Sequence, residues 1–193
     1  TGVSKFSKVS LFSGLNNLKD ITVDPRFSAI CGYTDTDVDT VFAPELPGLD
    51  REEIRHWYNG YNWTGEAVYN PFDLLLLFDV REFRPFWFET GTPTFLVDWL
   101  MAQPETFTPR LEHWQTELEL MGAFDVDGIE PEALLWQTGY LTIAATRQLP
   151  GMTEVHLTLP NREVRASLNV ALLRRLQGPT RRSTQNLPKL YDL

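Results

Sequence analysis

Apolar residues recur at three- and four-residue spacing along most of this chain, a period that predicts helices. In one example, Ile54, Trp57, Tyr58 and Tyr61 follow the segment 50–53, which contains three acids, and acids are favoured at a helix N-terminus. Together with capping residues, prolines and glycines, the spacing predicts helices over residues 35–43, 50–60, 71–78, 93–100, 109–121, 131–137 and 162–176.

Two of these helices begin at specific capping signals. Thr34 followed by Asp37 resembles a capping box, in which each residue bonds the backbone N–H of the other. Asn70 can cap the next helix, because Pro71 then occupies the first helical position, where its missing N–H costs nothing.

The period changes after residue 139. Residues 140–145 and 153–159 alternate like strands and are joined by a turn at Pro150-Gly151. The helix that follows carries an apolar stripe of Val164, Leu168 and Leu172. We therefore predict a mainly α fold of the α+β class, in which a helical bundle precedes a winged-helix-like unit with a β-hairpin.

Charge is divided unevenly along the chain. Residues 1–145 carry 9 basic and 23 acidic side chains (net −14), whereas residues 146–193 carry 8 and 3 (net +5), which together give −9. An acidic body repels nucleic acid, so only the last quarter could attract it. The helix before the hairpin contains Glu132 and no Lys or Arg, so we do not expect DNA binding there.

The final helix supports an alternative function, a protein- or nucleic-acid-binding module that acts through its arginines. The candidate partner-binding residues are Arg162, Arg165, Arg174 and Arg175. A solvated helix face with a few arginines explains the same pattern.

No metal site is expected. The acids Asp35, Asp37 and Asp39 alternate as in a calcium loop, but Thr40 replaces the required glycine, and the 125–128 cluster also departs from the pattern. Helix capping and turns explain both clusters better. The chain also contains no phosphate-binding loop and no strand that ends in paired acids for Mg²⁺.

Neither membrane insertion nor a disulfide is expected. The longest apolar run, 74–78, is far shorter than the ~20 residues of a membrane span, and Cys31 has no partner in the chain. With no signal peptide evident, we expect a cytoplasmic protein.

The aromatic residues at 57–63 allow two interpretations. Trp57, Tyr58, Tyr61 and Trp63 could stack on nucleotide bases, but their helical spacing favours packing in the core.

Ordered motifs along nearly all of residues 1–176 resemble a known family. These motifs are TGVSKFSKVSLFSGLNN at 1–17, CGYT at 31–34, WYNGYNW at 57–63 with YNP at 69–71, WFETGTPTFL at 87–96, QTGYLTI at 137–143 and PNREVRAS at 160–167. They resemble the bacterial AAA-ATPase-like family, in which a P-loop ATPase domain precedes a restriction-endonuclease-like nuclease domain. The chain also begins at Thr1 without an initiator Met, which suggests a fragment or a processed chain.

The resemblance implies a division of the chain. Residues 1–30 would be the last core strand and sensor region of the ATPase, 31–125 a helical lid, 126–178 the winged-helix-like unit and 179–193 a tail or interrupted linker. The phosphate-binding loop and the magnesium-binding acids would lie upstream, and the nuclease downstream. The partners implied are a missing ATPase-core segment or the nuclease domain.

The resemblance also implies candidate site residues. Ser4 and Lys5 stand where similar ATPases place a sensor for the γ-phosphate, and Gly91-Thr92-Pro93 resembles a lid motif near the adenine. ATP and Mg²⁺ would bind only in an intact parent protein. We expect no cofactor and no catalysis from this chain alone, because phosphoryl transfer needs a phosphate cradle together with a metal site.

Overall fold

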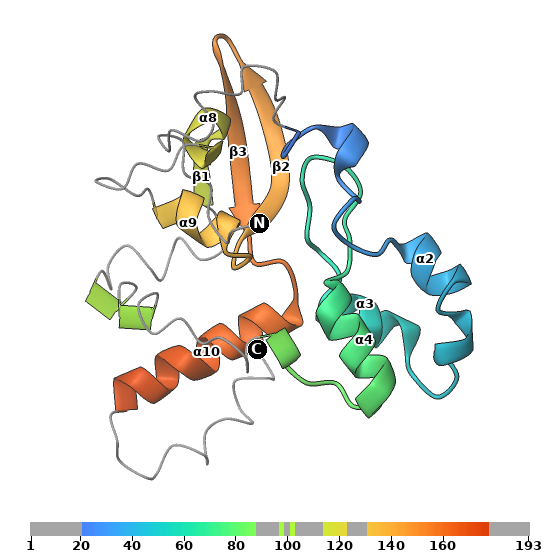
Figure 1. The fold of residues 1–193 in the computed structure, drawn as a ribbon. Helices are drawn as coiled ribbons and strands as arrows, with labels where there is room; N and C mark the ends of the chain where they lie inside the picture. The colour runs from blue at the N-terminus through green and yellow to red at the C-terminus, as the bar shows by residue number, and fades with distance from the viewer. Residues whose placement is uncertain (1–20, 88–96, 99–100, 103–113, 123–130, 178–193) are drawn as a thin grey trace, which may run out of the picture.

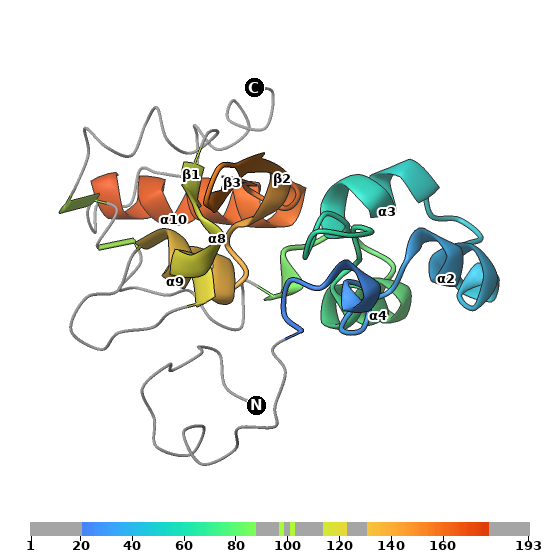
Figure 2. The same cartoon turned by 90° about the horizontal axis from the view of Figure 1, so that it is seen from above.

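The structure is a computed structural model that describes residues 21–87, 97–98, 101–102, 114–122 and 131–177 (Figure 1). It is mainly α, with one small antiparallel sheet, as the sequence predicts. Two groups of elements lie side by side in both views (Figure 2), each with its own hydrophobic cluster.

The first group, which we call the helical unit (residues 21–86), consists of short helices. Its elements are η1 (Pro25–Phe27), α2 (Asp35–Thr40), η2 (Ala43–Glu45), α3 (Arg51–Tyr58) and α4 (Pro71–Val80). Both predicted capping signals are confirmed. Thr34 Oγ1 accepts from Asp37 N at 3.1 Å while Asp37 Oδ2 accepts from Thr34 N at 2.8 Å, and Asn70 Oδ1 accepts from Phe72 N at 3.0 Å.

The core of the helical unit is rich in aromatic rings. Tyr58 is fully buried, and its ring stacks against Phe83 and Phe86 at centroid distances of 6.2 Å. The other buried members of this cluster are Val38, Ile54, Tyr69, Leu74, Leu77 and Phe78.

The second group, the winged-helix-like unit (the described residues from 97 to 177), contains the sheet. Its elements are β1 (Trp114–Glu117), α8 (Leu118–Gly122), α9 (Pro131–Gln137), β2 (Thr142–Leu149), β3 (Met152–Thr158) and α10 (Arg162–Gln177). The strand order is β1-β3-β2, all antiparallel, and the predicted β2–β3 hairpin turns at Gly151, which has a φ of +88°.

The prediction of a helix over 109–121 is wrong. Residues 114–117 form β1, which pairs with β3 from Trp114 opposite Leu157 to Glu117 opposite Glu154, and of the described residues in that span only those from 118 onward are helical. Burial alternates along β1 in the strand manner. The exposed edge of β3 offers hydrogen bonds that outweigh the local helical periodicity.

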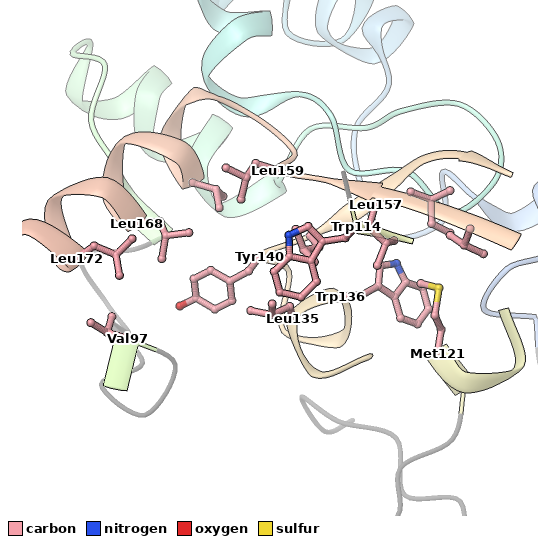
Figure 3. Packing of buried hydrophobic residues seen from close by; sticks show 14 residues of the cluster. Val97, Trp114, Met121, Leu135, Trp136, Tyr140, Leu157, Leu159, Leu168 and Leu172 are labelled. Atoms are coloured by element: carbon pink, nitrogen blue, oxygen red, sulfur yellow. The ribbon is translucent and has the colours of Figure 1, made fainter. Parts of the chain in front are cut away.

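The sheet and α10 enclose the second core, shown in Figure 3. Leu168 and Leu172 of the predicted α10 stripe face Tyr140, Leu135 and Val97 in this cluster. Its other buried members are Trp114, Met121, Trp136, Leu141, Ile143, Val155, Leu157, Leu159 and Val164. β1 and α8 therefore pack with the winged-helix-like unit, and the buried members of the two clusters separate between residues 86 and 97, although Val23 and Trp63 also pack against the second cluster.

The loop after α3 joins the two units. Gly60, at a φ of +120°, lies against the backbone of Pro160, and an added Cβ would stand 1.9 Å from the Pro160 carbonyl oxygen. Asn62 N donates to Thr142 Oγ1 at 2.7 Å. This segment approaches the other unit so closely that only glycine fits at its first position.

No helix among the described residues has the length and apolar character needed to cross a membrane.

Candidate functional site

The strongest candidate site is a buried polar cluster where α4 and α10 meet. Asp73, in the first turn of α4, and Glu163, in the first turn of α10, are both fully buried. Each belongs to a helix preceded by an asparagine that caps it: Asn70 accepts from Phe72 N, and Asn161 accepts from Val164 N at 3.1 Å. Two helix N-termini thus each bury one carboxyl group, which their dipoles favour.

Hydrogen-bond donors surround the two carboxyl groups. Trp87 N donates to Glu163 Oε1 at 2.8 Å. The side chains of Asn70 and Glu163 and the backbone N–H of Trp87 lie near enough to Asp73 to affect its ionisation. We call Asn70, Asp73, Asn161, Glu163 and the buried Tyr61 the junction cluster.

Burial dominates the electrostatics of this cluster. It raises the pKa of Asp73 to about 6, although the nearby Glu163 side chain, Trp87 N–H and Asn70 side chain act in the opposite direction. The pKa of Tyr61 is also raised, first by burial and then by the negative charges of Glu163 and Asp73. Asp73 therefore keeps its proton to a higher pH than an exposed aspartate does.

The sequence contained a partial signal for this site. Asp73 interrupts the apolar run from Phe72 to Phe78, and an acid in the first turn of a helix is ordinarily a solvated capping group. Glu163 stood among arginines and gave no sign of burial. Asp73 and Glu163 are 90 positions apart and come together only through tertiary packing. The spacing of residues along the chain does not predict such a contact.

The predicted nucleotide-site residues lie outside the part of the chain that the structure describes. These are Ser4 and Lys5 of the expected sensor and Gly91-Thr92-Pro93 of the expected lid motif. Trp87 is the last described residue before that motif, and its backbone is held by Glu163.

The four candidate arginines all lie exposed on α10 but do not form one surface. Arg162 pairs with Glu53 of α3 at 3.0 Å and lies 6.0 Å from the Trp57 ring, whereas Arg175 pairs with Asp98 at 2.8 Å. Arg165 lies near the start of the helix with Arg162. Arg174, near the other end, is roughly 18 Å further along the axis.

The acids of α2 have structural partners. Arg51 donates to Asp35 at 2.7 Å and to Asp39 at 2.6 Å, while Asp37 completes the capping box. Burial alone would raise the pKa of Asp35, but its hydrogen bonds with Tyr69 and Arg51 hold it below the ordinary value. Within the described ranges, no group of three or more His, Cys, Asp or Glu side chains could hold a metal ion. The 125–128 cluster lies outside them.

The aromatic residues that could have stacked on bases belong largely to the core. Tyr58 is fully buried, and its hydroxyl donates to Arg84 O at 2.9 Å and accepts from Arg84 N at 3.0 Å. Tyr61 is buried, and Trp57 and Trp63 are partly buried against the two clusters. The core interpretation is confirmed for the two tyrosines. Cys31 is exposed.

The chain is similar to one curated protein of greater length. It is 63% identical over 193 residues to an uncharacterized protein in the vnfD 5′ region of Azotobacter chroococcum mcd 1. The match covers all of this chain but only 37% of that relative. No family model matches the chain, and no solved structure matches it.

Proposed function

We propose that this chain is the lid and winged-helix portion of an AAA-ATPase-like protein, where it covers one side of a nucleotide site. The phosphate-binding loop and the magnesium-binding acids belong to other segments of that protein. In this arrangement Gly91-Thr92-Pro93 lies near the adenine, and Ser4 and Lys5 lie near the γ-phosphate. ATP and Mg²⁺ bind the intact protein and not this chain alone.

The observation that carries this proposal is the order of the two units. A unit of short helices precedes α9 and the β2–β3 hairpin, the order that the resemblance implies, although β1 and α8 fall within the expected lid and pack with the hairpin. The greater length of the Azotobacter relative is consistent with further segments beside this one. Fold-level analogy alone does not establish chemistry, so the nucleotide site needs a direct test.

Binding of a fluorescent ATP analogue provides that test. We expect Mg²⁺-dependent binding by the longer Azotobacter relative and binding at least roughly 100-fold weaker by this chain alone. Photo-crosslinking of an azido-ATP to the relative should label the peptide that aligns with Gly91-Thr92-Pro93. Tight Mg²⁺-dependent binding by this chain alone, or none by the relative, would contradict the proposal.

The alternative, a binding module that acts through the arginines of α10, has weaker support. Arg162 and Arg175 are already paired with carboxylates of this chain, which lowers their capacity to attract a partner. If Arg174→Glu combined with Arg175→Glu abolished capture of the remaining segments of the longer protein or of DNA, this alternative would replace the lid.

A further inference from the structure

The buried carboxyl pair of the junction cluster suggests a device that the nucleotide proposal does not require. Asp73 and Glu163 come from separate units with separate hydrophobic clusters, yet both side chains are completely buried at the contact. Close approach of two carboxyl groups in an apolar environment is unfavourable when both are ionised, because neither has a hydrogen to donate to the other.

The surroundings of Asp73 favour the protonated form of its carboxyl group. Neither of its carboxyl oxygens accepts a hydrogen bond of ordinary geometry from the described residues, and no Lys or Arg among them forms an ion pair with it. A protonated Asp73 would instead donate to the Glu163 carboxylate. Trp87 N already donates to Glu163 Oε1, and Tyr61 and Asn161 lie beside the pair, so the single negative charge that remains is stabilised.

We propose that Asp73 and Glu163 share one proton and form a latch between the helical unit and the winged-helix-like unit, and that loss of this proton loosens their contact. The proton replaces a repulsion between α4 and α10 with a strong, charge-assisted hydrogen bond. The neighbouring contacts of Gly60 with Pro160 and of Asn62 with Thr142 hold the junction in register but carry no charge.

Among the described residues, the titratable groups that face the pair do not change their charge over the same pH range. Tyr58 of α3 and Tyr61 of the following loop are phenols whose pKa burial raises, so both remain neutral. From α10, Arg162 is directed to Glu53, and the segment before Trp87 contributes the Arg84 backbone to the Tyr58 hydroxyl.

The direction of the pH effect follows from Asp73. Its pKa in the folded chain, about 6, lies above its ordinary value of 3.8, so its protonated form is favoured by folding. The stabilisation is complete below the ordinary value and is lost as the pH rises through about 6. The latch is therefore closed in mildly acidic solution and opens towards alkaline pH.

Two spin labels on the full chain can measure the contact. One is placed on Cys31, the exposed single cysteine of the chain, and the other on an Arg147→Cys variant at the exposed end of β2. We expect a narrow interlabel distance distribution at pH 5 that broadens at pH 8. The melting temperature should fall over the same range by on the order of 5 °C.

Replacing either carboxyl group with an amide of the same shape distinguishes the effect of the shared proton from the effect of packing. Asp73→Asn places a permanent donor against Glu163, so the distribution should stay narrow at both pH values. Glu163→Gln should likewise remove the pH dependence. The control is Asp79→Asn, because Asp79 lies exposed on the same helix, and it should respond as the unmodified chain does. The three histidines, His56, His113 and His156, are present in every variant, so their contribution cancels.

Three outcomes would overturn the latch. The first is an unmodified chain whose distances do not change with pH, and the second is an Asp73→Asn variant that keeps the full pH response. The third is a distribution that Ca²⁺ or Mg²⁺ narrows at pH 8 in the unmodified chain but not in Asp73→Asn, which would assign the pair to a bound cation. ATP plays no part in these measurements, so failure of the latch is distinguishable from failure of the nucleotide proposal.

Discussion

The two hydrophobic cores of this chain are built differently. In the helical unit, aromatic rings pack with their hydroxyl groups inside, and Tyr58 and Tyr69 are fully buried with named hydrogen-bond partners. In the winged-helix-like unit, the 16-residue helix α10 lays an aliphatic stripe on a hydrogen-bonded sheet (Figure 3). The first core depends on polar contacts as well as on apolar area, whereas the second depends mainly on apolar area.

Helix length accounts for part of this difference. The helices α2, α3 and α4 have 6, 8 and 10 residues, and helices of this length are marginal in isolation. Their stability must come from caps, ion pairs and packing. Substitutions that remove polar contacts should therefore affect the helical unit, and truncation of apolar side chains should affect the winged-helix-like unit.

The largest effect is expected where the two units touch. Gly60→Ala places a methyl group against the Pro160 carbonyl oxygen and forces alanine into a positive φ, so the free energy of unfolding should fall by about 4 kcal/mol. Gly151→Ala is the matched control, because that glycine also has a positive φ but has open space around it; its cost should be about 1 kcal/mol. Urea denaturation measures both. Equal losses would show that the junction is not tightly packed.

Truncation in the α10 stripe should have the next largest effect. Leu168 is buried among the second cluster, so Leu168→Ala should cost about 3 kcal/mol. Leu75→Ala, at an exposed position of α4, should cost less than about 1 kcal/mol. The comparison uses urea denaturation followed by far-ultraviolet circular dichroism. A Leu75→Ala loss as large as that of Leu168→Ala would reveal a hidden contact on α4.

Local signals predicted the elements well where a cap or turn marks them. Thr34 with Asp37, Asn70 with Pro71, and Gly151 lie where the structure has helix starts and the hairpin turn. β1 was missed because a four-residue strand owes its existence to β3, its partner more than 30 positions away. Periodicity describes what one segment prefers and carries no information about such a partner.

The junction cluster could not be predicted for a related reason. A buried carboxyl group and a solvated capping carboxyl group look alike in sequence, and only tertiary packing makes Asp73 a buried acid. The arginines of α10 illustrate the converse. They were candidates for an external partner, but Arg162 and Arg175 find carboxylates within the chain.

A smaller effect is expected from the ion-pair network of the helical unit. Arg51→Met removes contacts to Asp35, Asp39 and the Tyr69 hydroxyl and should cost about 1–2 kcal/mol, since the guanidinium is only partly exposed. Arg55→Met is the control, because Arg55 lies 3.6 Å from Asp35 and is more exposed; it should cost less than about 0.5 kcal/mol. Thermal melts at low and high salt give both values. If the two variants lost similar amounts of unfolding free energy, the Arg51 network would contribute no more than an ordinary surface ion pair.

The smallest effect is expected at the cap of α2, where polar contacts alone hold a helix start. Thr34→Ala removes one half of the capping box and should cost about 1 kcal/mol, while Thr36→Ala, at an exposed position in the same turn, should change stability by less than about 0.5 kcal/mol.

The other half of the box, Asp37, makes the stability of this helix start depend on pH. Hydrogen bonds from the Thr34 backbone and then from its side chain lower the pKa of Asp37, so its contribution is present at neutral pH and is lost as the pH falls below about 4. Acid therefore weakens this cap but closes the proposed Asp73–Glu163 latch. Chemical denaturation of the chain and of Asp37→Asn between pH 3 and pH 7 should show the two proteins converging at the acidic end, and a constant difference across that range would contradict the assignment.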